Sequence, residues 1–349
     1  DIHMNNNNKG ETMNKLTKIG ASALCGSLAA VSAANAGSLG VTGGVDMSWI
    51  SKPKESTGNP IGIGSNLTFS GSGEMDNGWT VGLSVAHSNK NTYSNTNVTL
   101  TVPSVGSFRI SQGVSGSGID RMDDMTPTVW EEAYGAGLST GIDTVSGVSA
   151  GTNIEYTPDM LPDGLTARIS WSPDAGGSAA ADKGSAESSG STKKGGFDVT
   201  LVADGDATPD GLTLYAGLSQ IDQHQNSTVY SDDISEMTAG IKYAVGSFTL
   251  GYQYSKEDNG RASTTTEYEN DAYGVTFSIN DDLSIGYNNY KSEQTSTTNV
   301  ETEASSVQIA YSAGGLSVRL ADQTVDNALY STATTAQRDV TTLSVALAF

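Results

Sequence analysis

Residues 245–254 read Val-Gly-Ser-Phe-Thr-Leu-Gly-Tyr-Gln-Tyr, a tight turn followed by a run in which every second residue is large and apolar. A period of two is the repeat of a β-strand, whose successive side chains point to opposite faces of the sheet. A tight turn that leads directly into such a run predicts one arm of a β-hairpin.

Six other turns have the same setting, with an apolar residue within two positions after each: residues 76–78, 103–106, 161–164, 208–211, 280–282 and 313–315. Seven hairpins supply fourteen strands, and one more strand at each end makes sixteen. The predicted strands are about 39–50, 65–75, 79–88, 93–102, 107–113, 151–158, 165–173, 196–204, 212–221, 235–244, 247–256, 267–279, 283–292, 302–312, 316–325 and 338–349.

The two faces of these strands differ in kind. In the last strand Leu343, Val345, Leu347 and Phe349 point one way, while Thr342, Ser344, Ala346 and Ala348 point the other. The second face is dominated by Ser, Thr, Gly, Asn and Gln in nearly every strand, whereas a soluble sandwich or β-solenoid would carry many Lys and Glu there. An even-numbered antiparallel sheet with an apolar outer skin and a small, polar inner face predicts an all-β fold, a 16-stranded transmembrane β-barrel.

The chain divides into three parts. Residues 1–12 are interpreted as an upstream extension or an expression remnant. Residues 13–36 have a basic start, a small apolar stretch and an Ala-Asn-Ala ending, which predict a secretory signal peptide. Residues 37–349 form the barrel, in which eight polar loops alternate with the seven turns, and the third loop, about 114–150, is the longest.

Composition argues against several classes of function. The net charge of −21 disfavours binding of nucleic acid through its phosphates. The one cysteine, Cys25, lies in the signal peptide, so no thiol chemistry is expected in the mature chain. Two G-x-S-x-G matches, 137–141 and 147–151, lack the strand, helix and histidine that a nucleophile elbow needs. We therefore expect no enzymatic activity and no cofactor or metal.

The chain resembles the general porins of Gram-negative outer membranes. The resemblance rests on the signal peptide, the sixteen-strand layout and the alternating C-terminal segment 342–349 with its final Phe. It implies a homotrimer of water-filled channels in the outer membrane, surrounded by its lipids, with the third loop folded inward. It also implies that Leu343, Val345, Leu347 and Phe349 form the signal read by the barrel-assembly machinery. General porins often carry Pro-Glu-Phe-Gly in the third loop, where residues 125–132 here read Met-Thr-Pro-Thr-Val-Trp-Glu-Glu.

The charges that would set selectivity are of two kinds. The third loop is acidic, with candidate pore-lining residues Asp120, Asp123, Asp124, Glu131 and Glu132. Strand parity places four bases in the lumen, since each lies between two residues of the apolar face: Arg109, Arg168, Lys242 and Arg319. Arg338 is also predicted to face the lumen, farther from the turns. An arginine facing lipid near mid-bilayer would cost about 2–4 kcal/mol, which supports the inward assignment.

These features predict a passive diffusion channel for small hydrophilic solutes and ions, with a mild preference for cations because acids exceed bases at the constriction. Three alternatives remain open from the sequence. They are a substrate-selective channel, an outer-membrane hydrolase and a structural or adhesive barrel with a plugged lumen.

Overall fold

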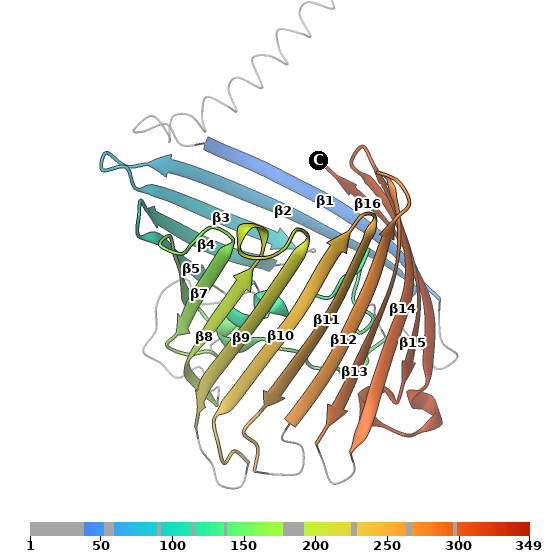
Figure 1. Ribbon diagram of the computed structural model, residues 1–349. Coiled ribbons are helices and arrows are strands. Elements are labelled where there is room, and N and C mark those ends of the chain that lie inside the picture. The colour runs from blue at the N-terminus through green and yellow to red at the C-terminus, as the bar shows by residue number, and fades with distance from the viewer. Residues whose placement is uncertain are drawn as a thin grey trace, which may run out of the picture.

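Sixteen antiparallel strands close into one barrel, with β1 paired to both β2 and β16 (Figure 1). The structure, a computed structural model, describes residues 38–51, 59–88, 92–112, 116–135, 138–176, 192–224, 229–262, 267–295 and 299–349. The predicted segments 1–12 and 13–36 lie outside these residues. The strands are β1 (Ser38–Ile50), β2 (Ile61–Glu74), β3 (Thr80–Ser88), β4 (Thr92–Val102), β5 (Gly106–Gln112), β6 (Asn153–Pro158), β7 (Leu165–Ser172), β8 (Lys193–Ala203), β9 (Leu212–Gln223), β10 (Ile234–Val245), β11 (Phe248–Asp258), β12 (Glu267–Ser278), β13 (Leu283–Gln294), β14 (Val300–Ala313), β15 (Leu316–Asp326) and β16 (Arg338–Ala348).

The predicted fold class and strand number are confirmed, and the differences lie at strand ends. β2 begins at Ile61 rather than near residue 65, because Ile61 and Ile63 continue the alternation and pair with Trp49 and Met47 of β1. β8 begins at Lys193 rather than near residue 196, across a register irregularity between Lys193 and Gly196. Among the described residues no helix is long and apolar enough to cross a membrane.

The turns that connect the strands owe their tightness to glycine where the backbone takes a positive φ. Gly211 has φ of 79°, and a β-carbon at this position would collide with the carbonyl oxygen of Ala244. A residue with a side chain is strained in this conformation, whereas glycine is not. The glycines of the sequence signature therefore fix the short turns on one rim of the barrel.

Apolar side chains form the outer surface of the barrel. Leu347 is 45% exposed and Val307 61% exposed, although both are large and apolar. The residues that alternate with these apolar residues along each strand face inward. Ser344 and Ser306 are examples, and both are buried. An apolar surface this extensive requires a non-aqueous environment, which the membrane supplies.

The last residue takes part in barrel closure. The amide of Phe349 donates to the carbonyl of Gly43 at 2.9 Å, and the amide of Gly43 donates to the carbonyl of Phe349 at 3.0 Å. Pairing thus continues one residue beyond β16, and the Phe349 side chain is 81% exposed on the outer rim.

Candidate pore constriction

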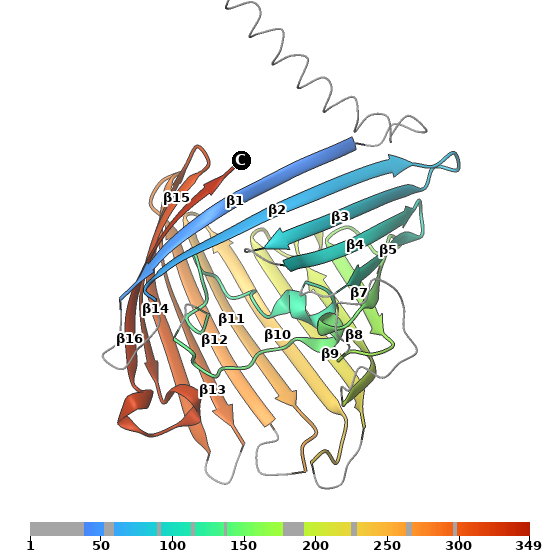
Figure 2. The ribbon, with the colours of Figure 1, turned by 180° about the vertical axis from the view of Figure 1, so that it is seen from behind.

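Residues 113–152 connect β5 to β6 and are called L3 below. The described residues of L3, 116–135 and 138–152, fold into the barrel (Figure 2). Its described part contains two short 3₁₀ helices, η1 (Gly118–Met122) and η2 (Gly147–Ala150). Residues far along the chain, from β6 to β16, hold it inside the lumen. The expected inward-folded third loop is therefore present.

Buried carboxylates on the wall hold both helical turns of L3. Asp198 of β8, with none of its surface exposed, accepts the amide hydrogens of Ile119 at 3.0 Å and Val148 at 3.2 Å. Glu236 of β10 accepts the amide hydrogens of Ser146 at 2.7 Å and Gly147 at 2.8 Å. Two carboxylates thus satisfy four backbone donors of the loop, in a place where unmet donors would be costly.

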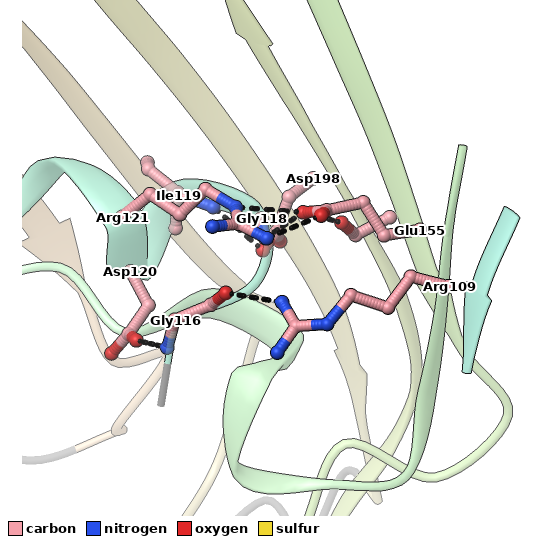
Figure 3. Close-up of polar contacts among 9 residues, drawn as sticks. Arg109, Gly116, Gly118, Ile119, Asp120, Arg121, Glu155 and Asp198 are labelled. Atoms are coloured by element: carbon pink, nitrogen blue, oxygen red, sulfur yellow. Dashed lines mark hydrogen bonds and ion pairs between the residues drawn. The ribbon is translucent and has the colours of Figure 1, made fainter. Parts of the chain in front are cut away.

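Glu155 of β6 joins L3 to a cluster of arginines (Figure 3). It accepts the amide hydrogen of Gly118 at 2.8 Å and forms a two-pronged ion pair with Arg121 at 2.5 and 3.1 Å. Arg109 lies beside this pair and donates to the carbonyl of Gly116 at 2.8 Å. Arg168 of β7 interacts electrostatically with both Arg121 and Glu155. Three guanidinium groups therefore lie around one carboxylate next to residues 116–121, a part of L3 called its base below.

Amide and guanidinium side chains hold the rest of the loop. Gln253 of β11 donates to the carbonyl of Met122 at 2.6 Å. Asn288 of β13 accepts the amide hydrogen of Ala133 at 2.7 Å and donates to the carbonyl of Glu131 at 3.3 Å. The carbonyl of Glu131 also accepts from Gln308 of β14. Between the two 3₁₀ helices, at a part of L3 called its far end below, Arg338 of β16 donates to the carbonyls of Leu138 at 2.5 Å and Ser139 at 2.8 Å.

Glycines on the wall let L3 lie close to the backbone of the strands. A β-carbon on Gly251 or Gly274, in neighbouring strands β11 and β12, would collide with Pro127. On β9 a β-carbon at Gly217 would approach Ile119 to 2.8 Å. Because glycine has no side chain, L3 can pack directly against the backbone of the wall at these positions. The path of the loop is therefore set by steric fit as well as by hydrogen bonds.

The open side of the lumen follows β1–β4. The anchors described above all lie on β5–β16, and inward-facing residues there, such as Thr238 and Gln323, are buried. By contrast Thr42, Asn66 and Ser70, which face inward from β1 and β2, are exposed. The passage is thus bounded by L3 on one side and by small polar side chains on the other.

The predicted loop acids occupy two kinds of position. Asp120 is turned back into the loop, where it accepts the amide hydrogen of Gly116. Asp124 is exposed and accepts the hydroxyl of Tyr134 at 3.0 Å, while Asp123, Glu131 and Glu132 are half-buried. Asp120 therefore shapes L3, and the other four are placed towards its surface.

Burial and crowding alter the titration of these acids. Burial, reinforced by the neighbouring charges of Asp124, Asp120 and Glu132, raises the pKa of Asp123 to about 8. Burial, together with Asp124 and Glu131, raises the pKa of Glu132 to about 7. Both groups consequently change charge near neutral pH.

The predicted bases lie at the ends of L3 or on the wall behind it. Arg109 and Arg168 belong to the arginine cluster at its base, and Arg338 holds its far end. Lys242 faces inward from β10, with Ile241 and Tyr243 on the outer face. Arg319 of β15 pairs with Asp46 at 2.7 Å and lies 5.3 Å from the ring centre of Trp130. All five are on β5–β16 rather than on the open wall.

Sequence reasoning missed the wall residues that hold the loop, above all Glu155, Asp198 and Glu236. A signal for them was present. Each carboxylate is flanked by an outward-facing apolar residue, as in Phe197-Asp198-Val199. The parity test that assigned the inward bases would have found these acids too.

Comparisons with known proteins agree with this architecture. A sequence model described as Gram-negative porin matches residues 20–315. None of the curated protein sequences searched matches the chain. Similar solved structures include Salmonella typhi OmpF in complex with daunomycin, at 15% identity over 89% of this chain and 97% of that chain, with a TM-score of 0.69.

Two further structures show the same fold. The trimer form of in-vitro folded OmpT from Vibrio cholerae is 12% identical, over 90% of this chain and 100% of that chain, with a TM-score of 0.63. An anion-selective porin from Comamonas acidovorans is 13% identical, also over 90% of this chain and 100% of that chain, with a TM-score of 0.63. From the family match and the closed barrel with its inserted loop, we conclude that this chain belongs to the Gram-negative porin family and is an outer-membrane channel.

Proposed function

We propose that the protein is a passive diffusion channel for small hydrophilic solutes and ions, with a mild preference for cations. The observation that carries the proposal is the polar wall of β1 and β2, whose inward residues Thr42, Asn66 and Ser70 are exposed to the lumen. Such a wall offers hydrogen-bonding groups to water and to polar solutes without a deep, specific site along most of its length.

The cation preference rests on how the charges are divided. Asp123, Asp124, Glu131 and Glu132 lie on the loop, and the inward positions of β1–β4 opposite carry mainly Ser, Thr, Asn and Gly. Most of the predicted bases are engaged at the ends of the loop. The fold alone does not decide selectivity, since one similar structure is an anion-selective porin. We therefore assign the preference to the uncompensated loop acids.

The proposed assembly is a homotrimer that meets through β1–β5. Within the described residues, the outward positions of these strands carry no Asp, Glu, Lys or Arg. The outer face of β11–β14 is different at its loop ends, where Lys256 pairs with Glu267 and Glu269, and Lys291 with Glu301. A face without charges along its whole height suits burial against another copy, whereas the charged rim suits the polar headgroup layer.

The C-terminal residues Leu343, Val345, Leu347 and Phe349 share the outward face of β16. We retain the proposal that they form the signal for the barrel-assembly machinery during insertion. These side chains point outward, and the backbone edge of β16 stays unpaired until β1 and β16 meet, so both are available to a partner during insertion.

Conductance in planar lipid bilayers tests the proposed function. We expect each insertion to give three equal closing steps, as an open homotrimer would. Full insertion with no conductance would instead indicate a plugged structural barrel. Saturation of the flux by one solute at low concentration would favour a substrate-selective channel.

Neutralising the loop acids should reverse the preference for cations. In the variant Asp123→Asn, Asp124→Asn, Glu131→Gln, Glu132→Gln, we expect the reversal potential in a salt gradient to shift towards anions, because the arginines at the ends of L3 would then dominate. The effect should weaken in high salt, since the screening length is about 8 Å at 0.15 M.

A matched control replaces the same number of carboxylates on exposed turns at the rim: Asp76→Asn, Asp163→Asn, Asp210→Asn and Asp282→Asn. The two variants are compared at pH 9, where Asp123 and Glu132 are ionised. This control should leave the reversal potential close to that of the unmodified channel. Equal shifts in the two variants would show that the total charge, rather than the loop, controls selectivity.

Selectivity should also depend on pH near neutrality. The pKa of Asp123 is raised to about 8 and that of Glu132 to about 7, so both are largely protonated at pH 6 and ionised at pH 9. Loop charge therefore becomes more negative as pH rises, and the cation preference should increase over this interval. Reversal potentials measured in steps from pH 6 to 9 test this, and the double variant Asp123→Asn, Glu132→Gln should flatten the curve. A flat curve for the unmodified channel would contradict the assignment.

A further inference from the structure

A recess of about 440 Å³ opens on the lumen side of the wall, where β15, β16, β1, β2 and β3 meet. Small residues line it, including Gly44, Gly64, Ser317, Ala346 and Ala348. Because these residues have short side chains or none, the wall is hollowed beside the open passage. Its charged lining residues are Asp46 and Arg319.

Asp46 keeps capacity to bind a donor from the lumen. Its Oδ2 accepts a hydrogen bond from Nη2 of Arg319 at 2.7 Å, and its Oδ1 accepts the hydroxyl of Ser344 at 2.6 Å. The side chain is nevertheless 42% exposed, compared with 20% for Arg319. Each carboxylate oxygen has two lone pairs, so each can accept one more hydrogen bond.

L3 brings a second carboxylate to the same place. Trp130 covers one face of the Arg319 guanidinium, with 5.3 Å between the guanidinium carbon and the ring centre. Glu131, the next residue, interacts electrostatically with both Arg319 and Asp46. Two carboxylates therefore share one guanidinium, which leaves a local excess of negative charge.

We propose that this recess binds the ammonium group of small primary amines as they cross the channel. An ammonium group has three hydrogen-bond donors and suits the remaining lone pairs of Asp46, and the nearby charge of Glu131 adds attraction. The amide oxygen of Asn66 lies near Gly44 and provides a further acceptor. The small residues leave space for a short alkyl chain. This inference rests on the proposed channel function and names a class of solute that would bind briefly inside the channel.

Block of single-channel current by n-butylammonium tests the proposal. Butyrate and n-butanol have a similar length but carry a negative charge or none. We expect brief, concentration-dependent interruptions with n-butylammonium and clearly fewer with the other two. Equal block by all three probes would overturn the proposal.

Two substitutions should weaken the block by n-butylammonium, and a third should strengthen it. Asp46→Asn and Glu131→Gln should each weaken block by up to about fivefold, the scale of a partly exposed charge pair. Arg319→Gln should strengthen block by a similar factor, because it removes the competing cation. Stronger block cannot result from simple damage to the fold, so this variant keeps the test informative if Asp46→Asn assembles poorly.

Asp163→Asn, an exposed turn residue away from the recess, is the matched control and should leave block unchanged. Weaker block in Arg319→Gln, or no change in Asp46→Asn and Glu131→Gln, would refute the site. A protein that inserts without conducting would refute the proposed channel function itself. A conducting channel that n-butylammonium does not block would refute this inference alone.

Discussion

Replacing Asp198 with alanine is expected to release both 3₁₀ helices of L3 from the barrel wall and to raise the single-channel conductance. The carboxylate accepts amide hydrogens from both η1 and η2, through Ile119 and Val148. It also lies against Gly118 and Gly147, where a β-carbon on either glycine would collide with it. A buried amide left without an acceptor costs about 1–3 kcal/mol, so the loss of both acceptor contacts weakens the attachment of L3 to the wall by about 2–6 kcal/mol.

Two measurements would follow the release of L3. Conductance should increase and become noisier, and limited proteolysis should cut within residues 116–135 of the variant but not of the unmodified protein. Glu74→Ala is the control, since Glu74 is a carboxylate on β2 at the rim, away from the anchors of L3. If Asp198→Ala conducts steadily at the original level and L3 stays protected, the remaining contacts suffice and Asp198 is not the main anchor.

Placing an arginine on the outer surface should have the largest effect on assembly. Val307 faces outward from β14, six residues before the strand ends at Ala313, and is 61% exposed. A charged side chain at this depth in the lipid costs about 2–4 kcal/mol. We expect Val307→Arg to reduce the yield of folded, heat-resistant barrel, as judged by mobility in gel electrophoresis without boiling.

Thr68→Arg is the matched control for depth. Thr68 lies on β2, also six residues before the strand ends at Glu74, but faces the lumen. Its arginine should be tolerated because it can remain in water, and it should change selectivity rather than folding. Equal losses of folded protein in the two variants would contradict the assignment of the two faces.

The strands could be predicted because their signal is local. Each turn is followed at once by its own alternating run, as in residues 245–254, and parity then assigns every side chain to a face without knowledge of the rest of the chain. The same reasoning placed Arg109 and Arg319 inward. Strand ends were less accurate, since the start of β2 depends on its pairing with β1 rather than on a turn.

The path of L3 could not be predicted, because its anchors come from distant strands. Asn288 is 155 residues from the amide of Ala133 that it holds, and Arg338 is 200 residues from the carbonyl of Leu138. The role of Gly251 and Gly274 depends on Pro127 lying above them, which no local pattern indicates. Sequence therefore identified the charged residues but not which of them face the passage.

The scattering of these anchors has a consequence for the order of assembly. Glu155, Asp198, Glu236, Asn288 and Arg338 are supplied one after another along the chain, and Arg338 belongs to the last strand. The contacts at the far end of L3 cannot exist until that strand is in place. The bore of the channel consequently reaches its final width only once β16 has joined the barrel, whatever the order in which the other strands form.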